Sequence, residues 1–111
     1  MTYTIEQFTV ALAEAEANAK QAAADYQEKH GDFDACGFAW TVIPGIRSNS
    51  KVGKYLAANK ISKWESERAH IVWNPGQAHC QSISVIEQGA LAFTETLKQH
   101  GIEAYTRSRL D

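Results

Sequence analysis

Apolar positions in the first thirty residues recur at intervals of three and four. They are Ile5, Phe8, Leu12, Ala15, Ala19, Ala22 and Tyr26. This spacing predicts a long helix with one apolar stripe. Thr4 with Gln7 three residues later forms a capping box at its start, and His30-Gly31 suits its end, because glycine readily adopts the left-handed C′ conformation. The alanines in the middle of the stripe allow a close approach, so we consider a homodimer through this helix.

A different pattern follows in Asp34 to Ile43, which reads DACGFAWTVI. Aromatic and β-branched residues dominate this run, and Pro44-Gly45 closes it with turn-forming residues. We therefore predict a buried strand, the first of the chain.

The remaining segments alternate between helix and strand signals. Ser48-Asn49-Ser50 can cap a short helix over Lys51 to Ala58, and Ile61 to Ala69 favours a loop. His70 to Trp73 reads as a second strand that stops at Asn74-Pro75-Gly76. Ser84 and Glu87 form a second capping box for a long helix that ends at His100-Gly101, and a third short strand follows over Ile102 to Thr106.

This order of elements, α-β-α-β-α-β, predicts one α+β domain over residues 1–111. We expect a small sheet of about three strands, packed with two long helices and one short helix. A chain of 111 residues with 44% hydrophobic residues can build one modest core.

The charge distribution changes this picture more than the net charge of −2 does. The segment before Gly37 is acidic, with seven carboxylates against Lys20 and Lys29, whereas the segment after it is basic. The molecule should therefore have two electrostatic faces. No signal peptide and no apolar run of the ~20 residues that span a bilayer stand out, so we expect a cytoplasmic protein with no membrane partner.

Candidate catalytic and metal-binding residues are few. Cys36 and Cys80 could form a disulfide, but two free thiols in a reducing cytoplasm are favoured. With His70 and His79 they supply atoms that zinc uses, but not in a recognised spacing. Cysteine–histidine catalysis is no better supported, and Cys36 is expected in the core. Ser48 to Lys51 matches S-x-x-K, although the companion motifs of that enzyme class are absent. We predict no catalytic residue, no metal and no cofactor.

A set of cations and rings remains as the candidate ligand-binding site. It comprises Arg47, Lys51, Lys54, Tyr55, Trp64, Arg68, Arg107 and Arg109. Arginine matches phosphate geometry and aromatic faces stack on bases, although a plain solvated basic face has the same composition. A small phosphorylated molecule, an acidic protein surface and a nucleic acid are the possible partners. Nucleic acid is the least favoured, because the acidic first helix would repel it unless that helix points away.

Among the tryptophans, Trp64 is the best candidate for an exposed ring, because its neighbours are charged. Exposed aromatics beside arginine are typical of binding hot spots. We expect Trp40 in the core and Trp73 at the end of the sheet.

Four segments, DACGFAW from Asp34, VWNP from Val72, QSIS from Gln81 and the final SRLD, also carry a resemblance. Together they resemble a family of small, uncharacterised bacteriophage proteins over nearly the whole chain. The resemblance implies no catalytic residue. It implies a short phage protein in the host bacterial cytoplasm, often an accessory factor that antagonises host immunity.

These observations lead to two main hypotheses. In the first, a non-enzymatic phage accessory protein binds and sequesters a small phosphorylated, nucleotide-type host molecule through the cation–aromatic set. In the second, the protein inhibits a host enzyme or a CRISPR effector by direct contact, using the acidic helix or the basic face. A small hydrolase or transferase that uses the cysteines or histidines is the least favoured reading.

Overall fold

The chain folds around a four-stranded antiparallel sheet, and the computed structural model describes residues 3–47, 49–58, 63–65 and 69–111. The elements in chain order are α1 (Ile5–His30), β1 (Gly37–Pro44), α2 (Lys51–Ala58), β2 (Lys63–Glu65), β3 (Ala69–Trp73), α3 (Ile83–Gln99) and β4 (Tyr105–Leu110). This is the α+β domain that the sequence predicts, with one more strand in its sheet.

The strands lie in the order β2-β3-β1-β4. Since β1 is antiparallel to both β3 and β4, and β2 is antiparallel to β3, β1 runs parallel to β2 and β3 runs parallel to β4. The units β1-α2-β2 and β3-α3-β4 are therefore interleaved, which is the split β-α-β topology. The helix α1 is an addition before that unit.

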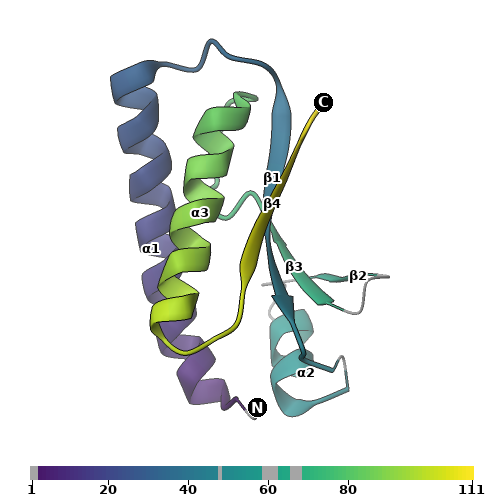
Figure 1. The fold of residues 1–111 in the computed structure, drawn as a ribbon. Helices are drawn as coiled ribbons and strands as arrows, with labels where there is room; N and C mark the ends of the chain where they lie inside the picture. The colour runs from purple at the N-terminus through teal and green to yellow at the C-terminus, as the bar shows by residue number, and fades with distance from the viewer. Residues whose placement is uncertain (1–2, 48, 59–62, 66–68) are drawn as a thin grey trace.

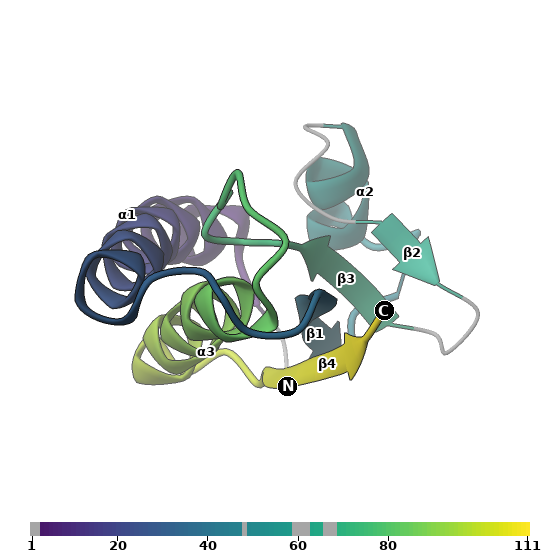
Figure 2. The same ribbon diagram turned by 90° about the horizontal axis from the view of Figure 1, so that it is seen from above.

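All three helices lie on one side of the sheet (Figures 1 and 2). The main core lies between them and the sheet, where Phe8 of α1, Leu56 of α2 and Phe93 of α3 meet Ile43 and Val72 of the sheet. In the described part of the chain, no helix covers the opposite face of the sheet (Figure 2). We call that face the outer sheet face.

The alanine stripe of α1 packs within the chain, against α3 and the turn after β3. Ala11, Ala15, Ala19 and Ala23 are buried there, whereas Ala22 is only partly buried. The close approach predicted from the alanines is confirmed, but it is intramolecular. The seam that suggested a homodimer is therefore already occupied.

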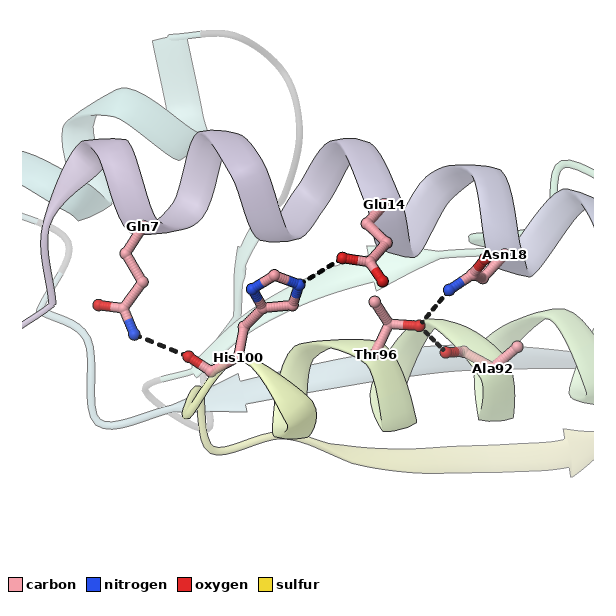
Figure 3. A network of polar contacts seen from close by, with 6 residues as sticks. All are labelled: Gln7, Glu14, Asn18, Ala92, Thr96 and His100. Atoms are coloured by element: carbon pink, nitrogen blue, oxygen red, sulfur yellow. Dashed lines mark hydrogen bonds and ion pairs between the residues drawn. The ribbon is translucent and has the colours of Figure 1, made fainter.

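Polar contacts border this helix pair (Figure 3). The Nε2 of Gln7 donates to the carbonyl of His100 at 2.9 Å, and the His100 ring contacts the Glu14 carboxylate at 2.5 Å. Further along α1, Nδ2 of Asn18 donates to Oγ1 of Thr96 at 3.0 Å. These contacts connect α1 to the C-terminal half of α3 and fix its register.

The helix ends test the predicted capping residues. Thr4 caps α1 as predicted, since it accepts from the backbone of Gln7 at 3.0 Å, but the Gln7 side chain donates to His100 and does not complete the predicted capping box. The helix ends at His30, and Gly31, whose φ is +75°, is its C-cap. The predicted second capping box is wrong. The N-cap of α3 is Ser82, which accepts from Val85, and Ser84 lies inside the helix.

Three strand assignments also differ from the sequence prediction. The last strand covers Tyr105–Leu110 and not 102–106, because six residues pair with β1 there. Residues 63–65, predicted as loop, form the short edge strand β2. Cys36 lies before β1 and is exposed, so its predicted core position is wrong. Among the described residues, no helix is long and apolar enough to cross a membrane.

Candidate functional site on the outer sheet face

The outer sheet face follows from the alternation of side chains along paired strands. On β1, Ala39, Thr41 and Ile43 point to the helices, as their contacts show. The residues between them, and their partners in register, share the other face. They are Phe38, Trp40 and Val42 of β1, Ile71 and Trp73 of β3, and Tyr105, Arg107 and Arg109 of β4.

Three rings form a continuous cluster on this face. Trp40 pairs with Trp73 across β1 and β3, and their ring centroids lie 4.8 Å apart. The Phe38 ring meets Trp73 edge to face, with 6.2 Å between centroids. Such contacts contribute about 0.5–1.5 kcal/mol beyond area burial. The rings are therefore held in place by each other before any ligand arrives.

Two arginines on the edge strand β4 complete the site. The guanidinium carbon of Arg109 lies 5.5 Å from the ring centroid of Phe38, its partner in register on β1. Arg107 lies over the ring of Tyr105 at 5.4 Å. Both contacts are within cation–π range, and a guanidinium over a ring keeps its N–H donors for an anion.

The part of the outer sheet face that carries the rings is open to solvent. Phe38 is 38% exposed, Trp73 is 45% exposed and Tyr105 is 38% exposed. Beside them on the same face, Val42, Ala69 and Ile71 form a small buried cluster with Trp40 packed against it. A contiguous exposed surface of this kind marks an interaction site.

Beside the rings, the face is cationic. Of the positions named above on β1, β3 and β4, the only charged ones are Arg107 and Arg109, and the register of β2 places Lys63 opposite Ile71 and Glu65 opposite Ala69 farther out. The nearest acid along β4 is Asp111, beyond the end of the strand. An anionic ligand therefore meets no carboxylate on the ring cluster itself.

A recess of about 170 Å³ adjoins the ring cluster where β1 begins and β3 ends. Phe38 and Trp73 line it together with Asn74, Cys80 and Gln81, and Ala39 and Ile86 line it from the helix side of the sheet. The backbone N–H of Gly37 donates to Gln81 at 3.1 Å, which holds the 80–82 segment against β1.

The predicted site residues fall into two groups. Arg107 and Arg109 lie on the outer sheet face, whereas Arg47 and Lys51 line a separate cavity of about 350 Å³ at the start of α2. Lys54 is exposed on α2, and Tyr55 is half-buried with its hydroxyl 3.2 Å from Oγ1 of Thr9. Arg68 and the side chain of Trp64 lie outside the described residues.

The sequence interpretation missed the rings of this face. Trp40, expected in the core, is only partly buried, and it packs on the outer side of the sheet. Trp73 does lie at the end of β3, as expected. Phe38 was used to predict the strand but not as a site residue, although its position two residues before Trp40 in a strand predicts that both share one face.

The titratable groups elsewhere serve the fold. Hydrogen bonds from the hydroxyls of Ser82 and Ser84 lower the pKa of the Asp34 carboxyl, which tethers the segment before β1 to the start of α3. Burial lowers the pKa of His70, on the inner side of β3.

Both cysteines are free, and the Sγ of Cys36 donates to Gln81 at 3.4 Å. In the described ranges, no three His, Cys, Asp or Glu residues are grouped to hold a metal.

Comparison with known proteins adds no further information, because no family model, no curated protein and no solved structure matches the chain. The function is therefore argued from the chemistry of the outer sheet face.

Proposed function

We propose that the protein binds a nucleotide-type ligand on the outer sheet face and does not convert it chemically. The observation that carries this proposal is the pair of arginines beside the exposed ring cluster, 5.5 Å from Phe38 and 5.4 Å from Tyr105. Nucleobases stack on aromatic rings and on guanidinium planes, and phosphates accept bidentate hydrogen bonds from arginine.

The acidic helix α1 would repel a polyanion, but it does not lie on this face. The acids of α1 include Glu6, Glu16 and Glu28, all exposed. However, α1 lies on the helix side of the sheet (Figure 2), whereas the register of the strands places the rings on the other face. Charges separated by the thickness of the molecule are strongly screened at physiological ionic strength, where the Debye length is about 8 Å.

In the phage context that the resemblance implies, such a binder would sequester a host nucleotide and so antagonise a defence signal. An inhibitor of a host protein is the second candidate, because aromatic residues and arginine also dominate protein–protein hot spots. Both candidate functions use the outer sheet face. They differ in whether that face binds a nucleotide or a host protein.

Calorimetric titration with mononucleotides, cyclic nucleotides and short oligonucleotides tests the proposal. Arg109→Ala removes a charged hydrogen-bond donor, so we expect roughly a 10- to 100-fold loss of affinity. Phe38→Ala should cost about 5- to 150-fold through lost stacking.

Arg47→Ala is the matched control, because it removes the same group from the cavity at α2. It should leave the affinity unchanged. If Arg47→Ala abolishes binding while Arg109→Ala does not, the site lies at α2. If no nucleotide or oligonucleotide binds, and the protein retains a stoichiometric protein from host lysate, the inhibitor hypothesis replaces this one.

A further inference from the structure

We infer that the ligand of the outer sheet face is a single-stranded nucleic acid, and that one of its bases enters the recess beside Phe38 and Trp73. This inference rests on the proposed function and narrows it to a polymeric ligand. It also assigns to Gln81 the contact that distinguishes one base from another.

The shape of the face favours a strand over a small nucleotide. Sites for small molecules are concave and bury most of the ligand. The ring cluster instead lies on an exposed part of the sheet, with Trp73 on β3 and Phe38 and Trp40 on β1, and Tyr105 adds a separate ring on β4. Neighbouring strands of a sheet lie about 4.8 Å apart, so these rings extend over the width of several bases. A nucleic-acid strand that runs along β4 can place its bases over the rings of β1 and β3 and gain from each contact.

The charges agree with this path. Arg107 and Arg109 both lie on β4, at one edge of the ring cluster. A strand can therefore run with its phosphates along β4 and its bases directed toward β1 and β3. This arrangement places anions and rings on matching sides, as in single-strand binding grooves.

The recess provides a place for one base. Its volume is about 170 Å³, and Phe38 and Trp73 are among the residues that line it. Its other wall is rigid, because Gly37 donates to the carbonyl of Gln81 at 3.1 Å and Asn74 donates to the carbonyl of Ala39 at 3.1 Å. A preformed recess of this kind binds a planar group at low entropic cost.

Gln81 is the side chain placed to contact the edge of that base. The amide of Asn74 is used within the chain, since its Nδ2 donates to Ala78 at 3.0 Å and its Oδ1 accepts from Ala78 at 3.3 Å. Gln81 accepts from Cys36 through Oε1, and its Nε2 is a donor in the exposed side chain. A donor in this position should favour a base that presents an acceptor, and a hydrogen-bonded edge discriminates more strongly than stacking does.

The test measures fluorescence anisotropy with labelled oligonucleotides of about 12 residues, a length that covers one binding face. The probes are homopolymers of dT, dC, dA and rU, and unlabelled mononucleotides compete with them. The variants are Phe38→Ala, Trp73→Ala and Gln81→Leu. Phe33→Ala is the aromatic control, because Phe33 is 92% exposed outside the sheet. Gln99→Leu is the amide control, on the exposed end of α3.

We expect the oligonucleotides to bind at least 10-fold more tightly than mononucleotides. Phe38→Ala and Trp73→Ala should each weaken binding about 5- to 150-fold for every sequence. Gln81→Leu should leave the affinity for the weakest-bound homopolymer unchanged. It should reduce the ratio between the affinities for the tightest-bound and the weakest-bound homopolymers at least threefold. Both controls should match the wild type. Thermal unfolding of each variant confirms that it is folded.

Equal affinity for mononucleotides and oligonucleotides, lost in Arg109→Ala, would overturn this inference and leave the proposed function intact. Failure of every probe to bind would overturn both. An unchanged base preference in Gln81→Leu would show that Gln81 in the recess does not distinguish one base from another. A dimer in sedimentation velocity that Trp73→Ala dissociates, and that excludes the oligonucleotides, would show that a second copy of the chain occupies the face.

Discussion

The helix α3 passes the turn after β3 in direct backbone contact at Gly89 and Gly76. A Cβ atom added to Gly89 would lie 2.9 Å from the Cα of Gly76 and 3.1 Å from its backbone nitrogen. A Cβ on Gly76 would lie 2.9 Å from the carbonyl oxygen of Ala19 on α1. Three backbone segments therefore meet where neither glycine leaves room for a side chain, and this contact sets the spacing of α1, α3 and the sheet.

Gly89→Ala should destabilise the protein despite its position inside a helix. Alanine gains about 1 kcal/mol of helix propensity over glycine, whereas overpacking against fixed backbone costs about 1–3 kcal/mol. We expect a net loss of up to about 2 kcal/mol in the free energy of urea unfolding. Gln88→Ala, one residue earlier in α3, should change it by less than about 0.5 kcal/mol. Equal stability of both variants and the wild type would show that the backbones can separate.

Ala15→Leu tests whether the alanine seam of α1 is packed within the chain. Ala15 is fully buried, so a leucine there should cost about 1–3 kcal/mol or more. Ala17→Leu makes the same change at an exposed position of the same helix and should be close to neutral. If the seam were instead an open dimer surface, Ala15→Leu would leave the thermal midpoint unchanged and alter the sedimentation coefficient.

The parts of the fold that the sequence predicts are those whose signals are local. The helix α1 follows from its apolar periodicity, from the cap at Thr4 and from the stop at Gly31. The strand β4 was misplaced because its residues are mostly exposed and polar, and only its pairing with β1 makes it a strand. The start of α3 was misplaced because Ser82 and Ser84 both suit an N-cap. Asp34, 48 residues before Ser82, contacts both serines.

The candidate site was predictable in its chemistry and not in its geometry. Arg107 and Arg109 belong to the predicted cation set, yet their ring partners differ from those expected. Register determines those partners, since it places Arg109 opposite Phe38 and Trp40 opposite Trp73. Cross-strand register depends on long-range pairing, which periodicity within one segment does not specify.

Acidification should weaken the tether at Asp34. Its pKa is lowered in the folded protein, so the carboxylate stabilises the fold above its unfolded pKa of about 3.9, and this contribution disappears as the pH falls through the folded pKa. We expect Asp34→Asn to be less stable than the wild type at pH 7, with the difference shrinking below about pH 4. Urea unfolding over this range measures it. Glu95→Gln, an exposed carboxylate on α3, should show no such convergence.

Acidification should also lower the stability of the fold through His70, at a higher pH than through Asp34. Burial lowers its folded pKa, so the unfolded chain binds the proton first as the pH drops below about 6.5. The slope contributed by one proton is at most about 1.4 kcal/mol per pH unit. We expect His70→Gln to flatten the curve of unfolding free energy between about pH 6.5 and pH 5, whatever its stability at pH 7. The exposed His79→Gln should retain the wild-type slope.

The salt dependence of oligonucleotide binding counts the phosphates that the arginines contact. For single strands, the slope of log K against log salt is about −0.7 per neutralised phosphate, so Arg107 and Arg109 together should contribute about −1.4. Arg109→Ala should reduce the magnitude of the slope by about 0.7, and Arg107→Ala should do the same. Arg47→Ala should leave the slope unchanged, because its cavity lies at α2 and not on the outer sheet face. Anisotropy titrations between about 50 and 300 mM KCl measure these slopes. A slope that Arg109→Ala does not change, while Arg47→Ala reduces it, would place the phosphates at α2 and contradict a path along β4.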